Sequence, residues 1–289
     1  MLQAKDLKNK IKSVKSINHI TKAMKMVAAA KLKKSQKKME SIKPYSDKVE
    51  ELVSSIVSQP VEIDSPYMRK RENSNSLLLV IISSDKGLCG SYNTNLIKEF
   101  ETLYRRNNWS EKKLYIVTMG KKITDYIKKS KHDLYMSFLN NETSPTLEDV
   151  KPFFDATITP FLDKKVDEVK ILHTKYINNI TNNITLTELL PITISSDLAV
   201  DSENNKFVFD PGMEEIFQFL MPRYVRTKLY SLLMNTITSE HSVRMTSMEH
   251  ATEKSTEMID ELSLKLNKVR QEAITLELLD IISGSEALK

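Results

Sequence analysis

The chain has 289 residues, and its 43 Lys and Arg against 38 Asp and Glu give a formal net charge of +5. This length is enough for one large domain or two ordinary ones. The single cysteine, Cys89, excludes a disulfide framework and a cysteine-based metal site, and the longest apolar run, 77–82, is too short to span a bilayer.

The N-terminal segment predicts a long coiled-coil helix. No glycine precedes Gly87, and residues 1–43 contain no proline. Apolar or small residues recur at steps of three and four, which indicates a seam for a partner helix, with Asn18 filling one place in it. We expect Pro44 to bend or briefly break the helix, which then resumes. The other seam positions are Leu7, Ile11, Val14, Thr21, Met24, Ala28, Leu32, Ser35, Met39 and Ile42.

The same segment is rich in lysine. Residues 1–48 carry fourteen lysines against three acidic residues. A basic helix is typical of contacts with nucleic acid, an anionic membrane or an acidic protein surface, and equally of a plain solvated face. Few aromatic residues precede Tyr45, so the base-stacking platforms of nucleic-acid binders are missing.

After a predicted linker at 59–75, strands and helices alternate. This pattern predicts a mainly parallel sheet flanked by helices. The expected strands are 77–83, 113–119, 134–139, 168–175, 182–190 and 206–209, and the expected helices are 93–105, 121–129 and 147–162.

The chain returns to helix after residues 210–212, with Pro222 near the start of a long uninterrupted part. Seam positions repeat here at Thr236, Ser247, Ala251, Ser255, Leu262, Leu266, Val269, Ala273 and Leu276. The last stretch, 275–288, is apolar on every side, because its leucines and isoleucines surround the helix axis. Such a helix must be enclosed, and we expect another protein to enclose it.

These features predict an α/β fold combined with a long antiparallel coiled coil. The N- and C-terminal helices would pair, with a Rossmann-like, mainly parallel α/β domain inserted between them. Parallel pairing would need a far longer connection. The predicted domains are an N-terminal coiled-coil helix at 1–58, an α/β domain at 76–210 and a C-terminal coiled-coil helix at 211–289.

Two turns resemble phosphate-binding loops by position only. Residues 83–91 and 119–122 each follow a strand and precede a helix, yet neither matches a nucleotide-binding signature. The alternative at 83–91 is a tight turn with Asp85 and Lys86 exposed. The five histidines lack metal-ligand spacing, and no G-x-S-x-G occurs. The sequence therefore predicts no catalytic residue, no cofactor and no metal site.

Three segments resemble the gamma subunit of F-type ATP synthases. They are Ile20–Leu32 (ITKAMKMVAAAKL), Ser84–Gly90 (SDKGLCG) and the C-terminal Ile274–Glu277 (ITLE) with Asp280 and Ser283-Gly284. The one departure in the last segment is Ser285, where the family usually has Ala.

The resemblance implies a central-stalk rotor without a catalytic site of its own. It would transmit rotation of the c-ring to the catalytic beta subunits, so that ADP and phosphate become ATP, and hydrolysis would drive the reverse rotation. The implied partners are a ring of three alpha and three beta subunits, the c-ring and small central-stalk subunits of the delta/epsilon type, with no nucleic acid. The chain would be peripheral to the membrane through the complex.

The resemblance also implies contact residues toward the alpha/beta ring. Arg270 and Gln271 match polar residues near the beta subunits, with Lys86 as a nearby contributor. A second segment matches residues close to the moving part of the beta subunit, although Met24 within it is equally explained as a seam residue. This segment comprises Thr21, Lys22, Met24 and Lys25. The apolar end would turn in an apolar sleeve through Leu276, Leu279 and Ile282.

The resemblance extends to location and regulation. Residues 238–248 and 255–259 are similar to mitochondrial forms, so we expect the matrix side of the mitochondrial inner membrane. The alternative is the cytoplasmic face of a bacterial plasma membrane. With Cys89 alone, the cysteine-pair switch of chloroplast-type gamma subunits is unavailable.

Two other interpretations stay open from the residues. One is a small α/β enzyme with a coiled-coil dimerisation arm and a phosphate loop at 87–91, which predicts nucleotide binding by the isolated chain. The other is a basic coiled-coil adaptor, which predicts salt-dependent binding to anionic lipid or duplex nucleic acid.

Overall fold

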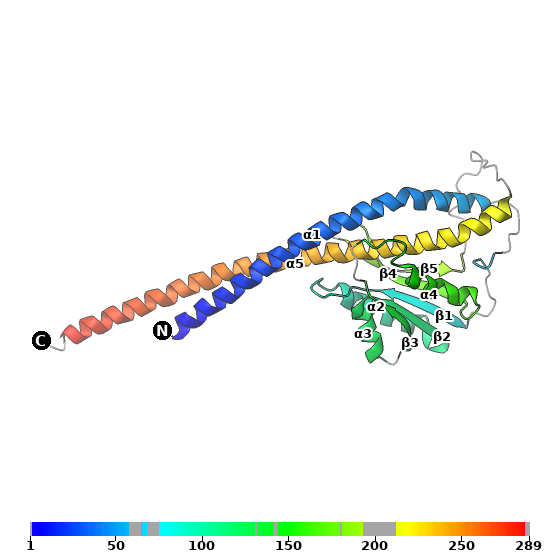
Figure 1. The fold of residues 1–289 in the computed structure, drawn as a ribbon. Coiled ribbons are helices and arrows are strands. Elements are labelled where there is room, and N and C mark those ends of the chain that lie inside the picture. The colour runs from blue at the N-terminus through cyan, green and yellow to red at the C-terminus, as the bar shows by residue number, and fades with distance from the viewer. Residues whose placement is uncertain are drawn as a thin grey trace. The chain divides into compact units, whose positions relative to one another are not determined.

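A computed structural model describes residues 2–57, 65–68, 75–130, 132–140, 144–179, 181–192 and 212–286 (Figure 1). The chain forms two compact units. The helix-pair unit consists of Met1–Ala29 with Arg244–Lys289, and the sheet unit consists of Ala30–Val243. No helix within the described residues is both long and apolar enough to cross a membrane.

The elements follow the alternation that the sequence predicts. In chain order they are α1 (Leu2–Val57), β1 (Ser76–Ile82), α2 (Tyr92–Arg106), the 3₁₀ turn η1 (Trp109–Glu111), β2 (Lys113–Met119), α3 (Lys121–Lys129), β3 (Leu134–Phe138), α4 (Lys151–Leu162), β4 (Glu168–Tyr176), β5 (Asn182–Leu190) and α5 (Met213–Glu286). The strand predicted at 206–209 and most of the linker predicted at 59–75 lie outside the described residues.

The five strands form one sheet in the order β3-β2-β1-β4-β5. Strand β1 pairs in parallel with β2 and β4, and β2 pairs in parallel with β3. Only the β4–β5 pair is antiparallel among them. The predicted mainly parallel sheet between two long helices is confirmed.

Strand β1 is apolar at nearly every position because helices cover both faces of the sheet. Its odd-numbered residues, 77–81, pack with Leu96 and Phe100 of α2 and with Ile123 and Ile127 of α3. Its even-numbered residues, 78–82, join the larger core on the opposite face. The strand's alternation therefore assigns α2 and α3 to one face.

The larger core recruits both terminal helices. Phe153 and Phe154 of α4 pack there with Val53 of α1 and with Phe217 and Leu233 of α5. All five side chains are at most 4% exposed. The last part of α1 and the first part of α5 thus belong to the hydrophobic core of the sheet unit.

We expected Pro44 to bend or briefly break the helix, and the break was wrong, because α1 continues through Pro44 from Leu2 to Val57. A proline removes a single helical hydrogen bond. The flanking Ile42 and Val49 pack on the core, which holds the helix together on both sides of the proline. Helix α5 likewise contains Pro222 without ending there.

Helix α4 begins four residues later than the sequence predicts. Residues 147–150 form a turn, and α4 starts at Lys151. The backbone N–H of Thr146 donates to the Asp149 carboxylate at 2.7 Å, and the N–H of Asp149 donates to the Thr146 hydroxyl at 3.3 Å. These reciprocal bonds close the turn ahead of the helix, as in a capping box.

Gly120 sits where the end of β2 approaches the turn after β1. Its φ is +102°, and a Cβ there would lie 2.3 Å from the carbonyl oxygen of Ser83. We expect Gly120→Ala to lower the free energy of unfolding of the sheet unit by about 2–5 kcal/mol, through backbone strain and a steric clash. Fluorescence of the buried single tryptophan, Trp109, during urea titration measures this. Gly212→Ala is the matched control, since a Cβ there meets nothing within 4 Å. Equal midpoints for both variants would contradict the prediction.

His173 on β4 gives the sheet unit a pH dependence. Burial lowers the pKa of His173 to about 4, and its Nε2 lies 3.0 Å from the Thr187 hydroxyl. Between the ordinary pKa of about 6.5 and this lowered value, the unfolded chain binds a proton that the folded chain does not. Stability therefore falls on acidification through this window, by about 2 kcal/mol at about pH 5.

The measurement compares urea midpoints at neutral pH and at about pH 5 for the wild type and for His173→Gln, which retains a hydrogen-bonding side chain. We expect a smaller loss of stability on acidification in the variant. The same loss in both proteins would show that His173 does not cause it.

Candidate functional site

The helix-pair unit joins α1 and α5 in antiparallel register. Asn18 contacts Thr252 and Ser255, and Lys25 pairs with Glu249, so residue numbers rise along one helix as they fall along the other. The antiparallel coiled coil that the sequence predicts is therefore confirmed. Continuing this register places the start of α1 opposite about residue 271 of α5.

A layer of polar side chains lies in the seam of this helix pair. The Asn18 amide donates to the Thr252 carbonyl at 3.0 Å and to the Ser255 hydroxyl at 2.8 Å. It also lies 2.9 Å from the Thr256 hydroxyl, and Thr252 donates to Thr21 at 2.9 Å. We call these five residues the polar layer. A polar residue at a seam position sets helix register, because any slip leaves its hydrogen bonds unmade.

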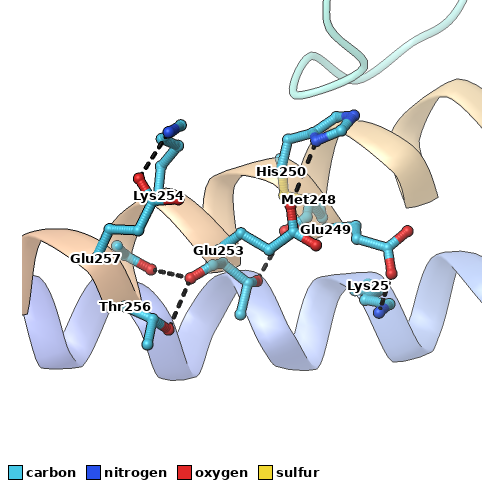
Figure 2. A network of polar contacts seen from close by, with 10 residues as sticks. Lys25, Met248, Glu249, His250, Glu253, Lys254, Thr256 and Glu257 are labelled. Atoms are coloured by element: carbon cyan, nitrogen blue, oxygen red, sulfur yellow. Dashed lines mark hydrogen bonds and ion pairs between the residues drawn. The ribbon is translucent and has the colours of Figure 1, made fainter.

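Lys25 and Glu249 form an ion pair next to the polar layer. Their Nζ and Oε1 atoms are 2.5 Å apart, and Figure 2 shows the pair bridging the two helices. The hydrogen bond from Lys25 and its positive charge hold the pKa of Glu249 below its ordinary value. The stabilisation is therefore complete above the ordinary carboxyl pKa and lost as the pH falls through the lowered one. Because both side chains are about 40% exposed, the pair is worth little at physiological salt.

The C-terminal end of α5 extends beyond its partner. Helix α5 continues to Glu286, so about 15 residues, or about 22 Å of helix, have no α1 residue opposite them. Figure 1 shows the C-terminal end projecting past the N-terminal end in this helix pair. Six large apolar side chains here are each 53–68% exposed. We call this group the apolar tip: Ile274, Leu276, Leu278, Leu279, Ile281 and Ile282.

The apolar tip exposes apolar surface that an enclosing partner would bury. Full burial of each leucine or isoleucine side chain is worth about 1.5–3 kcal/mol. Contiguous exposed apolar surface of this kind marks interaction sites. The sequence places Leu276 in the seam. It is exposed because it lies beyond the first residue of α1, so no α1 residue is opposite it.

The turn at 119–122 does not present free amides at the start of α3, because side chains and a carbonyl of the turn after β1 accept them. The Asp85 carboxylate accepts the backbone N–H of Lys121 at 2.8 Å, at the N-terminus of α3. The next two N–H groups of α3 donate to the Ser84 carbonyl and the Ser83 hydroxyl. These bonds already satisfy the amides that an anion would need. The expectation of an exposed Asp85 was wrong, since this contact leaves it half-buried, whereas Lys86 is exposed as expected.

Comparison with known proteins decides the family. The family model described as ATP synthase matches residues 3–288. The ATP synthase gamma chain of Trichlorobacter lovleyi is 33% identical over 289 residues, which is the whole of both chains. The chain belongs to the ATP synthase gamma chain family. In this family the gamma chain is a non-catalytic, central-stalk subunit of a membrane-associated complex.

Solved structures share the fold of the present chain. A chain in the central stalk and c-ring structure of the Tetrahymena thermophila mitochondrial ATP synthase has a TM-score of 0.60 at 26% identity. The match covers 80% of this chain and 99% of that one. A chain of the Euglena gracilis mitochondrial ATP synthase, at 19% identity, matches in fold with a TM-score of 0.67 over 99% of this chain and 94% of that one.

The predicted ring-contact residues fall into separate groups on the gamma-type fold. Lys22 is exposed, Met24 and Lys25 are half-buried, and Thr21 is buried in the polar layer. Arg270 and Gln271 are exposed and lie opposite the first residues of α1. They directly precede the apolar tip, which contains Leu276, Leu279 and Ile282.

The structure does not gather these residues into one cluster. Along α5, about 32 Å separates Glu249, the partner of Lys25, from Arg270. Lys86 belongs to the sheet unit. The roles assigned to all of these residues remain predictions.

The polar layer is the feature that sequence reasoning left without a role. Its signal was present, because Asn18 fills a place in an otherwise apolar or small seam. The acceptors, however, come from α5, and the pairing register that brings them opposite Asn18 is not written in either helix alone.

We expect Asn18→Ala to loosen the helix pair locally, because it removes the half-buried amide and leaves Ser255 without that donor. The measurement is amide hydrogen exchange. Protection at residues 10–29 and 244–262 should fall by about tenfold, which corresponds to about 1.4 kcal/mol. Protection in β1, β2 and β4 should not change. Ser16→Ala is the control, since among the described residues that hydroxyl bonds to the Lys12 carbonyl of its own helix and not to α5. Equal effects of the two substitutions would contradict a register role for Asn18.

Proposed function

We propose that this chain is the central-stalk rotor subunit of a proton-translocating F-type ATP synthase. It would transmit c-ring rotation to catalytic beta subunits, which make ATP from ADP and phosphate, with ATP hydrolysis driving the reverse rotation. The observation that carries the proposal is the apolar tip on the unpaired end of α5. A shaft end that turns inside an apolar sleeve presents a different side to the sleeve at each rotational position, and the apolar tip spreads its side chains around more than half of the helix circumference.

A shaft of this kind performs no chemistry. Two paired helices are not threefold symmetric, so they contact each of three beta subunits differently. Each shaft angle then stabilises a different conformation, and hence a different nucleotide affinity, at each site. This is a coupling free energy between shaft angle and nucleotide binding, and it is reciprocal.

The charges along α1 support a ring of protein partners. The lysines at positions 5–22 are exposed, which suits long-range attraction to acidic surfaces of beta subunits. Arg270 and Gln271 would contact the ring just before the tip. Lys22, Met24 and Lys25 provide the lower contacts, with Thr21 supporting them from the polar layer.

The sheet unit would form the foot of the rotor. We assign it contact with the c-ring and with small central-stalk subunits of the delta/epsilon type. The corresponding domain division is a coiled-coil helix at 1–58, an α/β domain at 76–210 and a coiled-coil helix at 211–289. The location we propose is the matrix side of the mitochondrial inner membrane, with the cytoplasmic face of a bacterial plasma membrane as the alternative.

A pull-down of the tagged full-length chain tests the assembly. In mild detergent at low and moderate salt, we expect alpha and beta subunits to co-purify, each in about threefold excess over this chain. Mass spectrometry of the co-purifying chains measures the ratio. Recovery of the chain alone or as a homodimer would refute the rotor assignment, and nucleotide binding at 87–91 would then be the next measurement.

Changes in the apolar tip test the shaft mechanism. We expect deletion of residues 275–289, or the triple change Leu276→Gln, Leu279→Gln and Ile282→Gln, to lower ATP synthesis by the assembled complex several-fold. The tip would then lose apolar burial of about 1.5–3 kcal/mol per side chain. The Trp109 unfolding midpoint should stay unchanged, because the tip lies in the other unit. Glu277→Gln, an exposed position in the same segment, is the matched control. Unfolding of the sheet unit on deletion would contradict this architecture.

A further inference from the structure

A cavity of about 370 Å³ lies within the sheet unit between α1, α4 and α5. Tyr45 of α1, Phe154 of α4 and Thr227 of α5 contribute to its lining. Phe154 and Thr227 are only 2% and 9% exposed, so the cavity reaches into the packed interior of the unit. Its volume falls at the small end of the range for small-molecule sites.

Three cationic side chains converge on this cavity. They are Lys151 at the start of α4 and Arg223 and Arg226 on α5, against the single carboxylate of Glu148 in the lining. Arg226 is partly engaged, with its Nη2 3.8 Å from the Asp155 carboxylate. The lining therefore carries an excess of positive charge.

Two of these cations lack a counter-charge within the part of the chain that the structure describes. The Arg223 guanidinium lies over the Phe219 ring, 3.9 Å from its centroid, which holds the side chain in place without neutralising it. Within the described residues, no carboxylate forms an ion pair with Arg223 or Lys151. The Thr227 hydroxyl also makes no hydrogen bond in this part of the chain. An anion could thus take up donors that are otherwise unused.

The start of α4 adds to the positive potential. Leu147 and Glu148 from the preceding turn and Lys151 from the first turn of the helix line the cavity. The N-terminal end of a helix carries a partial positive charge, which favours anions. Tyr45 and Leu147, both more than half exposed, supply an apolar wall.

We propose that this cavity binds a small molecule that carries a phosphate or pyrophosphate group next to an apolar part. Arginine presents a planar fork of donors that matches phosphate oxygens, and lysine adds a point charge. A small cavity that reaches the core suits a compact ligand better than an extended acidic peptide. The site is separate from the turn at 83–91 and does not depend on the rotor function. The ligand can be a free phosphate compound or the phosphorylated headgroup of a lipid.

Calorimetric titration of the full-length chain with pyrophosphate tests the free form of the ligand. Pelleting with phosphatidylcholine vesicles, with and without phosphatidic acid, tests the lipid form. We expect Arg223→Gln and Lys151→Gln each to weaken binding by about tenfold or more, since each removes a charge-assisted contact. Lys98→Gln, an exposed lysine on α2, is the matched control and should bind as the wild type does. The Trp109 unfolding midpoint establishes that each variant is folded.

The outcomes separate the two sources and the competing class of partner. Pyrophosphate binding that the cavity variants lose supports a soluble ligand, and binding only to phosphatidic acid vesicles, lost in the same variants, supports a lipid headgroup. Absence of binding to both probes overturns the proposal. So does a loss of binding in Lys98→Gln as large as that in the cavity variants, or binding of a polyglutamate peptide that displaces pyrophosphate at equal charge concentration.

Discussion

The antiparallel pairing of α1 with α5 through small and polar side chains governs the helix-pair unit. Small seam residues such as Ala28 let the helices approach closely but bury little apolar surface. Hydrogen bonds from Asn18 to Thr252 and Ser255 then specify the register. That register fixes which residue of α5 lies opposite the first residue of α1. It therefore determines how much of the C-terminal helix is left without a partner. The exposed apolar tip is a direct consequence.

The sheet unit serves as a structural base for the two terminal helices. In the sheet unit, the turn after β1 is bonded to the start of α3, where the Asp85 carboxylate accepts the backbone N–H of Lys121. Within the described residues, no group of His, Cys, Asp or Glu side chains could hold a metal ion. The large core that joins the sheet to both terminal helices instead provides a stiff base. Such a molecule is suited to transmitting position, while its partners supply the reaction.

Charge is distributed in the same way, on surfaces rather than in a reaction centre. The exposed lysines of α1 attract acidic surfaces at long range, and salt weakens this attraction. Such an attraction suits a surface that must release and re-form contacts as it moves. The cations around the cavity between α1, α4 and α5 differ, because Arg223 is held by stacking on Phe219 and is directed to a fixed place. The lysines of α1 favour transient contacts, and the cations around the cavity favour a bound ligand.

The sequence by itself determined the local elements and the surfaces along them. Strands β2 and β5 and helix α3 lie at the predicted residues, because the alternation of apolar and polar side chains reflects helix and strand periods that need no distant partner. The seam of α1 and the apolar tip follow from the same periodicity. Only the tertiary structure decided the strand order, the continuity of α1 through Pro44, the bond from Lys121 to Asp85, and the convergence of Lys151 with Arg223. Each of these depends on packing between segments far apart in the chain, and no local period records which segments will meet.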